Sequence, residues 1–383
     1  MTIGLMADKL SESQALLILN ALPEVGPITT HRLLEAFDGD PCRILSAGQE
    51  KLMEVRGVGE VISRSIVSWR EVFDLEKEEA RMMANGVGFI RAADAGYPPL
   101  LKEIHDPPIG LYRKGNQVLD RPCVAIVGSR RTTLYGQTVA AKLGADLARA
   151  GFCVVSGLAR GIDTAAHEGA LSAGGPTAAI LGHGIDIIYP PENLALYRRI
   201  EHEGALFTEF PFSRRADRQS FAMRNRIVAG MSVALIVVES DVNGGSMITA
   251  KFAGDQGRLV FAVPGRIDQP TSAGCHQLIR DGATLLTGID DLLSELSYLD
   301  GLRPTAVMPN ASRHVTIPTP DDISPEEQKL LSCFAGGAIL SIDGLCDASG
   351  LSLSEVSAAL MRLEIRRLVA KRVDGTFEAR TAI

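Results

Sequence analysis

The fold is decided by the stretch Cys123-Val124-Ala125-Ile126-Val127-Gly128-Ser129-Arg130-Arg131, in which an apolar run ends at a glycine and polar residues follow. Continuous apolar runs of this length are typical of strands buried on both faces of a parallel sheet. Similar runs return along the chain, with helix-forming sequence between them, at residues 152–155, 178–181, 205–207, 233–238 and 259–263. This alternation predicts an α/β fold with a Rossmann-like, doubly wound, mostly parallel sheet, to which residues 283–287 add a short strand.

Helical sequence precedes this core, and residues 1–84 are expected to form an all-helical domain. Two segments in it, residues 22–28 and 53–61, are similar to each other and to the turns of helix-hairpin-helix or SAM-like domains. In such turns, glycines let backbone N–H groups meet a phosphate. Glu54 and Glu60 would repel a phosphate, so a docking domain is slightly favoured over direct DNA contact.

Prolines mark the connections between domains. Residues 85–120 are rich in glycine and proline and are interpreted as a connector that leads into the core, which spans residues 85–300. Residues 301–325 hold five prolines, which predicts an interdomain linker over residues 301–324.

After the linker, residues 325–383 have the outline of a winged-helix-like domain. Ser324 is expected to cap a helix that starts at Pro325, two more helices follow, and a hairpin turns at Asp374-Gly375. Five basic residues are a candidate contact for duplex DNA, and equally a solvated face or a partner surface: Arg362, Arg366, Arg367, Lys371 and Arg372.

The bulk composition excludes several classes of protein. The chain has 383 residues and a formal net charge of -7, so any nucleic-acid site must be a local patch on an acidic body. Six cysteines without a C-x-x-C pair indicate neither a zinc site nor a disulfide framework, and we expect no metal and no cofactor. The start lacks a signal-peptide layout and no apolar run is long enough to cross a bilayer, so we expect a soluble, cytoplasmic protein with no membrane partner.

A local basic patch lies between residues 212 and 226. Five arginines and one aspartate give this segment a charge of +4, and Phe221 lies among them. Arginines bind phosphates and an aromatic ring stacks on a base, which together indicate a surface for single-stranded nucleic acid. A charge run by itself is more often a solvated helix face.

Further anion-binding features follow the strands of the predicted sheet. Carboxyl ends of parallel strands share one edge, so we expect the turns after them to lie together. Glycines permit close approach of the backbone, arginines form a fork for phosphate, and a helix N-terminus attracts an anion. One such turn alone is more often structural, but several on one edge favour an extended polyanion site. The candidate residues are Gly128, Ser129, Arg130, Gly157, Arg160, Gly161, Gly244, Gly245, Ser246, Thr249 and Lys251.

A dinucleotide-dependent or hydrolytic enzyme is the main competing class. The first turn lacks G-x-G-x-x-G, the second strand ends without a carboxylate for a ribose, and the chain has no P-loop and no hydrolase motif. His167 and His183 have no evident orienting partner in the sequence. Asp163 is interpreted as a cap or turn ligand, and Glu209 as a brace for an arginine.

Five motifs resemble, in order, those of the DNA-processing protein family DprA, also called Smf. They are Gly128-Ser129-Arg130 and the segments 156–163, 224–230, 244–250 and 257–265. The likeness is strong over residues 95–295 and looser at both ends. It implies a Rossmann-like core that binds single-stranded DNA, forms a homodimer and helps load the RecA recombinase during natural transformation. It also implies no catalytic turnover.

The resemblance carries roles over to single residues. Arg130 would grip a phosphate, Arg218 is the basic residue three positions before the aromatic, and Phe221 is that aromatic. Arg226 has a second interpretation, in which it faces inward and holds the loop. The residues expected to contact DNA by this likeness are Arg130, Arg218, Phe221, Arg224, Asn225 and Arg226, together with the turn at Gly244, Gly245 and Ser246.

Two other functions stay open at this point. Nucleotide-hydrolysing enzymes on a similar core carry a P-G-G-x-G-T-x-x-E loop, whose proline and glutamate are replaced here by Asn243 and Lys251. A cation in place of the catalytic carboxylate favours binding an anion over cleaving a glycosidic bond. The second alternative is a duplex-DNA-binding regulator that acts through the winged helix.

Overall fold

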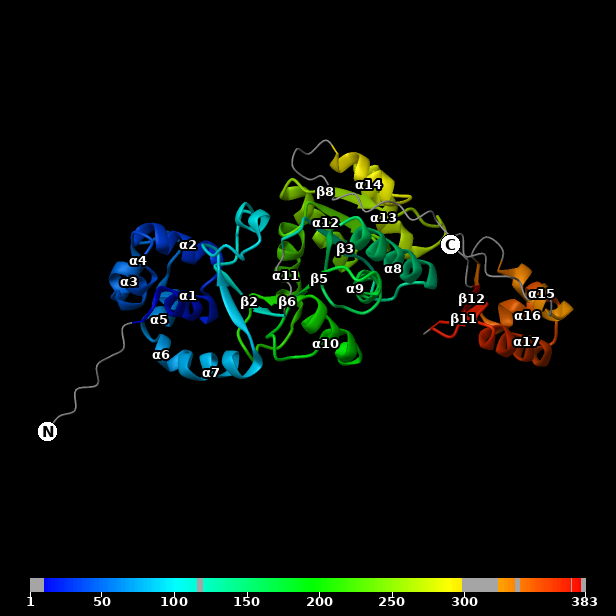
Figure 1. Cartoon of the computed structure of the whole chain (residues 1–383), viewed down its shortest axis with the longest axis horizontal. Coiled ribbons are helices and arrows are strands. Elements are labelled where there is room, and N and C mark those ends of the chain that lie inside the picture. The colour runs from blue at the N-terminus through cyan, green and yellow to red at the C-terminus, as the bar shows by residue number, and fades with distance from the viewer. Residues whose placement is uncertain (1–9, 116–119, 298–322, 335–337, 373, 380–383) are drawn as a thin grey trace. The chain divides into compact units, whose positions relative to one another are not determined.

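The computed structural model describes residues 10–115, 120–297, 323–334, 338–372 and 374–379. The chain divides into two compact units. The first contains the N-terminal helices and a nine-stranded sheet, and the second contains the C-terminal helices and a three-stranded sheet (Figure 1).

The nine-stranded sheet is the centre of the first unit, with the strand order β1-β2-β6-β5-β4-β3-β7-β8-β9. Neighbours from β6 to β9 are parallel, whereas β2 is antiparallel to both β1 and β6. The prediction of a Rossmann-like, mostly parallel sheet is therefore confirmed. The strands are β1 (Gly88–Arg91), β2 (Gly110–Lys114), β3 (Cys123–Val127), β4 (Cys153–Ser156), β5 (Thr177–Leu181), β6 (Ala205–Thr208), β7 (Ala234–Val237), β8 (Leu259–Ala262) and β9 (Thr284–Leu285).

Helices cover both faces of this sheet. On one face, α9 and α10 bury Leu171 and Tyr197 against β5 and β6. On the other face, α11, α12 and α13 bury Ile227, Ala253 and Cys275 against β3, β7 and β8. The helices and short 3₁₀ turns of this part are η1 (Pro99–Lys102), α8 (Leu134–Arg149), α9 (Ile162–Ser172), η2 (Pro191–Asn193), α10 (Leu194–Glu203), α11 (Arg218–Gly230), α12 (Gly245–Asp255), α13 (Pro270–Arg280) and α14 (Ile289–Leu296).

Two strands of the sheet lie where the sequence predicted only a connector. Both β1 and β2 fall within residues 85–120, and the connector interpretation was wrong for these segments. They are short, and three of the four β1 residues are only partly buried, so they carry no strong apolar pattern. Their antiparallel pairing extends the sheet beyond β6 and links the N-terminal helices to the core.

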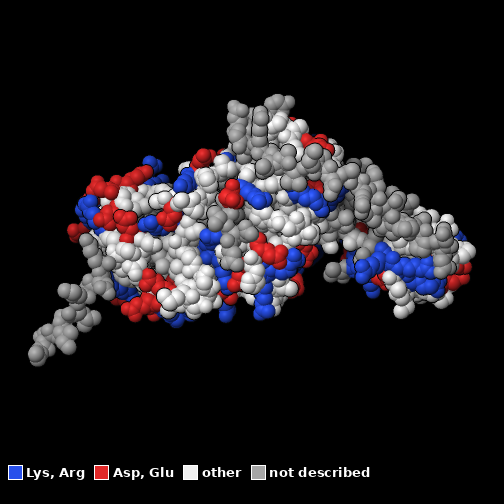
Figure 2. Space-filling view, viewed as in Figure 1, with Lys and Arg blue, Asp and Glu red and all other residues white. Residues whose placement is uncertain are grey.

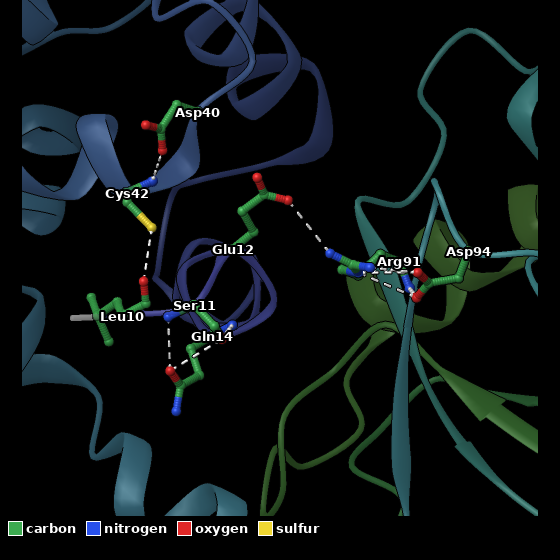
Figure 3. A network of polar contacts seen from close by, with 8 residues as sticks. All are labelled: Leu10, Ser11, Glu12, Gln14, Asp40, Cys42, Arg91 and Asp94. Carbon is green, nitrogen blue, oxygen red and sulfur yellow. Dashed lines mark hydrogen bonds and ion pairs between the residues drawn. The ribbon is translucent and has the colours of Figure 1, made fainter. Parts of the chain in front are cut away.

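The N-terminal segment is all-helical, as predicted. Ser11 and Gln14 form a capping box at the start of α1, and apolar residues such as Ile18, Leu33 and Leu52 make a separate small core. Figure 3 shows how α1 meets β1, where Arg91 pairs with Asp94 at 2.7 Å and lies 3.7 Å from Glu12. The helices are α1 (Glu12–Ala21), α2 (Pro27–Ala36), α3 (Pro41–Ser46), α4 (Gln49–Met53), α5 (Glu60–Val67), α6 (Trp69–Val72) and α7 (Leu75–Asn85).

The second unit has the predicted winged-helix order of elements. A capping box between Ser324 and Glu327 starts its first helix, and the hairpin strands pair with a third short strand in the order β10-β12-β11. Among the described residues, no helix combines the length and the apolar character needed to cross a membrane. The elements are α15 (Pro325–Cys333), β10 (Ile339–Leu340), α16 (Ile342–Ser349), α17 (Leu353–Ile365), β11 (Val369–Lys371) and β12 (Phe377–Ala379).

Candidate nucleic-acid interface

The candidate turns meet at the carboxyl ends of the central strands. The strand order reverses between β3 and β7, and open α/β sheets bind ligands at such a switch point. The turn after β3 carries Gly128, Ser129 and Arg130. The turn after β4 carries Gly157, Arg160 and Gly161, and the turn after β7 carries Gly244, Gly245 and Ser246. We call this region the sheet edge.

The turn after β3 is held between its two neighbours. The Ser129 N–H donates to the Glu239 carbonyl at 2.6 Å, which ties the turn to the end of β7. A Cβ on Gly161, whose φ is +79°, would lie 2.4 Å from the Ser129 carbonyl oxygen. Glycine is therefore needed at Gly161 for both its backbone angle and the close approach of the two turns.

The turn after β4 is fixed by side chains. Asp163 accepts hydrogen bonds from the N–H groups of Gly157 and Ala159 at 3.1 and 3.2 Å, which confirms its interpretation as a turn ligand. The Asn193 amide donates to the carbonyl of Leu158, a residue held at a positive φ of 56°. The turn is thus rigid and its conformation is set before any ligand arrives.

Hydrogen bonds fix the start of helix α11 and also the segment that precedes it. Asp217 and Ser220 form a capping box, and the Ser220 hydroxyl donates to the Gly182 carbonyl after β5 at 2.7 Å. Upstream, the buried Glu78 of α7 accepts hydrogen bonds from the Phe212 N–H at 2.9 Å and from the Tyr112 hydroxyl at 2.8 Å. The N-terminal domain therefore helps to fix the arginine-rich segment over the sheet edge.

Arg224 is a buried cation that has no counterion in direct contact. The residue is 5% exposed, and its guanidinium makes no hydrogen bond or ion pair with any described residue. Burial lowers the pKa of Arg224 to about 10; the negative charge of Asp163 opposes this shift and the positive charge of Arg130 adds to it. A Cβ on Gly157 would lie 1.5 Å from the Arg224 Nη1, so glycine makes the space that the guanidinium occupies.

His167 and Asp163 lie near this cation. Burial, with a further effect of the Arg224 charge, lowers the pKa of His167 to about 3, so the imidazole is neutral. Thr177 is the orienting partner that the sequence did not reveal: its hydroxyl donates to the Val154 carbonyl and therefore accepts from His167 Nδ1 at 2.6 Å. Burial raises the pKa of Asp163, against the lowering effects of Arg224 and of its backbone hydrogen bonds.

The five arginines of the basic patch are not equivalent. Arg226 lies inside the fold, where it pairs with Glu209 at 2.7 Å and with Asp106 at 3.0 Å, so the structure does not bring it to the sheet edge. Its inward interpretation and the bracing role of Glu209 are confirmed. Arg214 pairs with Asp217 at 2.7 Å. Arg215 and Arg218 are exposed and make no ion pair with the residues that the structure describes.

Phe221 lies at the sheet edge, beside Arg130. The Arg130 guanidinium carbon is 4.9 Å from the centre of the Phe221 ring, a cation–π distance. The ring of Tyr189, in the loop after β5, lies 5.7 Å from the Phe221 ring, measured between ring centres. Sequence reasoning missed Tyr189; the only signal was an aromatic residue in a turn after a predicted strand.

Asn225 of α11 connects the turn after β7 to this cluster. Its amide donates to the Gly245 carbonyl at 3.4 Å, and the Ser246 hydroxyl donates to the Ser240 hydroxyl at 2.7 Å. Thr249 is buried, and Lys251 is exposed about 9 Å along α12 from its first residue by the helical rise. The start of α12 therefore belongs to the sheet edge, whereas Lys251 does not lie at that helix end.

Arg160 lies at the edge but has an intramolecular partner. Its guanidinium pairs with Glu192, with one Nη2–Oε2 distance of 3.1 Å, and both side chains are about half exposed. Their pairing lowers the pKa of Glu192, chiefly through the hydrogen bond. A phosphate that binds Arg160 must compete with this carboxylate.

The other two regions offer weaker anion sites. Figure 2 shows acidic residues gathered on the N-terminal helices and a basic band on the winged-helix domain. In that domain, however, Arg362 lies 2.5 Å and Arg366 3.8 Å from the buried carboxylate of Glu327. No group of His, Cys, Asp and Glu side chains within the described residues has the arrangement of a metal site.

Comparison with known proteins agrees with these features. Residues 88–297 match the family of DNA recombination-mediator protein A, and residues 316–375 match the DprA winged helix domain. The chain is 32% identical to protein Smf of Synechocystis over 97% of its length and 99% of that protein. It is also 38% identical to a DNA processing protein DprA of Mycobacterium tuberculosis over 74% of its length and 70% of that protein.

Two solved structures share the fold. DprA from Streptococcus pneumoniae matches with a TM-score of 0.65 and 32% identity, over 75% of this chain and 98% of that one. DNA processing protein A from Helicobacter pylori, whose structure concerns its single-stranded DNA binding mode, matches with a TM-score of 0.50 and 30% identity, over 55% and 95%. The sheet, the winged helix and these likenesses together show that the chain belongs to the DprA/Smf family of DNA recombination mediators.

Proposed function

We propose that the sheet edge binds single-stranded DNA with little sequence preference, and that the protein helps load the RecA recombinase onto that strand in natural transformation and DNA recombination. The observation that carries the DNA-binding part is Arg224, a buried guanidinium that makes no hydrogen bond within the part of the chain that the structure describes. A buried charge without a partner is costly, so a ligand anion is the natural partner for it.

The surroundings of Arg224 favour a chain of phosphates over a single anion. Arg130 and Arg218 add exposed cations, and the N–H groups at the start of α12 add donors at a helix N-terminus. Phe221 adds an aromatic ring beside Arg130. Proteins that bind single strands without sequence preference place cations along the phosphate backbone and aromatic rings on which any base can stack.

Family membership supports the remaining parts of the proposal. We propose RecA and a second copy of the chain as protein partners, in the cytoplasm, where the recombinase and its DNA meet. We further propose that the chain is not an enzyme: Asp163 holds backbone N–H groups and His167 is held by Thr177, which are structural roles. For the domains, we propose the division 1–84, 85–300, 301–324 and 325–383.

Fluorescence anisotropy tests the DNA-binding part. A labelled oligothymidine and a duplex of equal length are titrated with the whole protein across a salt series. We expect tighter binding to the single strand, and a slope of log affinity against log salt that Arg130→Ala makes shallower by about 0.7, one phosphate contact. Arg198→Ala, an exposed arginine on α10, is the matched control and should leave the slope unchanged.

Other outcomes would point to the alternatives. Preference for the duplex, lost when residues 310–383 are deleted, would favour a regulator that acts through the winged helix. Release of base from any nucleoside monophosphate would establish an enzyme. Loading is tested separately, by the rate at which RecA filaments form on strands covered with single-strand-binding protein; no acceleration would overturn the mediator part.

A further inference from the structure

Tyr189 is an exposed ring beside the aromatic residue of the basic patch. It is 39% exposed and lies in the loop between β5 and η2, far in sequence from Phe221. The two ring centres are 5.7 Å apart with a tilt of 39°. This separation is typical of aromatic side chains in contact, so the two rings form one continuous apolar surface.

Phe221 itself is contacted on several sides. The Arg130 guanidinium lies over its ring at 4.9 Å, and Tyr189 lies beside it. The backbone of Gly182 is so near that a Cβ there would lie 2.8 Å from the Phe221 Cδ1. Of the two rings, Tyr189 is therefore the one that offers more accessible area, because Phe221 is only partly exposed.

The loop that presents Tyr189 is fixed by hydrogen bonds at its base. The Tyr197 hydroxyl donates to the Ile185 carbonyl at 2.5 Å, and the Gly184 N–H donates to the Arg214 carbonyl at 2.8 Å. The buried ring of His183 packs edge-on against Tyr189, with 6.2 Å between ring centres. A ring held in this way loses little further conformational freedom when a ligand binds.

Arginines lie in the turns that carry or adjoin the two rings. Arg130 lies on the Phe221 side. Arg160 pairs with Glu192, which comes three residues after Tyr189 in the chain. Two adjoining rings, with Arg130 over one of them and Arg160 in a neighbouring turn, match a short run of unpaired bases together with their phosphates.

We propose that Tyr189 and Phe221 form a two-ring stacking shelf for consecutive bases of a single strand, with Tyr189 as a base-stacking residue in its own right. The inference rests on the proposed function and extends it, because it gives the sheet edge two stacking positions. The ligand class is an unpaired nucleobase within a nucleic-acid strand, and the shelf makes no demand on which base is present.

The test compares a strand with bases and a strand without them. Whole protein is titrated with labelled oligothymidine and with an abasic oligonucleotide of the same length, which keeps the phosphates. Tyr189→Leu should weaken oligothymidine binding by about 5- to 100-fold, the range for loss of one stacked base, and should leave abasic binding unchanged. Tyr189→Phe keeps the ring and should restore most of the affinity.

The controls separate this inference from the proposed function. Leu194→Ala removes a nearby exposed apolar side chain and should not change binding. If Tyr189→Leu binds oligothymidine like the parent while Phe221→Leu binds weakly, the shelf is wrong and the DNA site stands. An equal loss for both oligonucleotides also overturns the shelf, because it indicates a change in the fold. If the parent binds neither oligonucleotide, the proposed function itself fails.

Discussion

Cations gather in two regions of this protein, and they differ in what neutralises them. In the winged-helix domain, the carboxylate of Glu327 is 1% exposed and has Arg362 and Arg366 beside it. At the sheet edge, Arg224 is also buried, but no carboxylate of the described residues touches it. The number of basic residues therefore does not locate a polyanion site. What matters is whether the fold already supplies the counterion, because a cation with an internal partner has less to gain from a phosphate.

The largest effect is expected from removing the counterions of Glu327. Burial opposes the ionised form of this carboxyl, but the hydrogen bond from Arg362 and the charge of Arg366 outweigh it, so the pKa of Glu327 is lowered. Arg362→Met with Arg366→Met leaves a buried carboxylate uncompensated. We expect a loss of about 2–3 kcal/mol in the stability of this domain, below the usual 3–5 because Arg362 is half exposed. Hydrogen exchange in α15 and α17 measures it.

Oligothymidine binding by this double variant tells the two regions apart. Because both arginines serve an internal carboxylate, the affinity for the single strand should stay within about two-fold of the parent, the scatter expected of exposed pairs. Arg367→Met with Lys371→Met is the matched control, since these exposed residues make no ion pair among the described residues. A strong loss of DNA binding with unchanged hydrogen exchange would show that Arg362 and Arg366 are DNA ligands after all.

The second prediction is the opposite result at the sheet edge: DNA binding is lost and stability is kept. Arg224→Met should weaken oligothymidine binding by about 10- to 100-fold, the value of one hydrogen-bonded charge. The same change should keep or raise the stability of the core, because it removes a buried charge that has no partner. Anisotropy and hydrogen exchange in β4 and β5 measure the two effects. Reduced protection together with reduced binding would make Arg224 a structural residue.

The different fates of Arg224 and Arg226 show how far the sequence leads. The sequence likeness assigned both residues to DNA, but residues two apart in a helix start their side chains in nearly opposite directions, and here only Arg224 lies at the sheet edge. Which of them meets a carboxylate depends on Glu209 and Asp106, which lie on other elements. The sequence motif contains both arginines, but only the folded structure shows that Arg226 pairs with internal carboxylates and that Arg224 does not.

The strands and the aromatic residues also differ in how far the sequence predicts them. Strands β3 to β7 were predictable because burial on both faces requires continuous apolar residues. Strands β1 and β2 were not, because their pairing at the side of the sheet leaves several of their residues partly exposed. Phe221 was found through its basic neighbours, whereas Tyr189 has none in sequence and reaches the site only through the loop after β5.

A third prediction compares how stability depends on pH at two buried groups, His167 in the core and Glu327 in the winged-helix domain. His167 has a folded pKa of about 3, below the ordinary value of 6.5, so the unfolded chain takes up the proton first as the pH falls. Its stabilising contribution is complete above pH 6.5 and declines from there towards pH 3. Between pH 6.5 and 5 the parent core should lose about 1–2 kcal/mol more than His167→Asn, which keeps a donor for Thr177.

Glu327 should respond in a lower pH window than His167. The pKa of this carboxyl is lowered in the folded domain, so its contribution is present above the ordinary value of 4.5 and is lost as the pH falls below it. Hydrogen exchange at pH 6.5 and 5, corrected for intrinsic rates, reads β4 and β5 separately from α15. Equal pH dependence of the core in the parent and His167→Asn would show that the imidazole is not held neutral.

The smallest effect is expected where a cation of the sheet edge does have a partner. Arg160 pairs with Glu192 on the surface, so Glu192→Gln should release the guanidinium and tighten oligothymidine binding by about two-fold, as for an exposed ion pair. Glu203→Gln removes the same charge from a surface pair with Arg199 on α10 and is the matched control. The gain should shrink in high salt, which screens exposed charges. Equal gains from both variants would indicate a general charge effect, whereas a gain confined to Glu192→Gln would place Arg160 among the phosphate ligands.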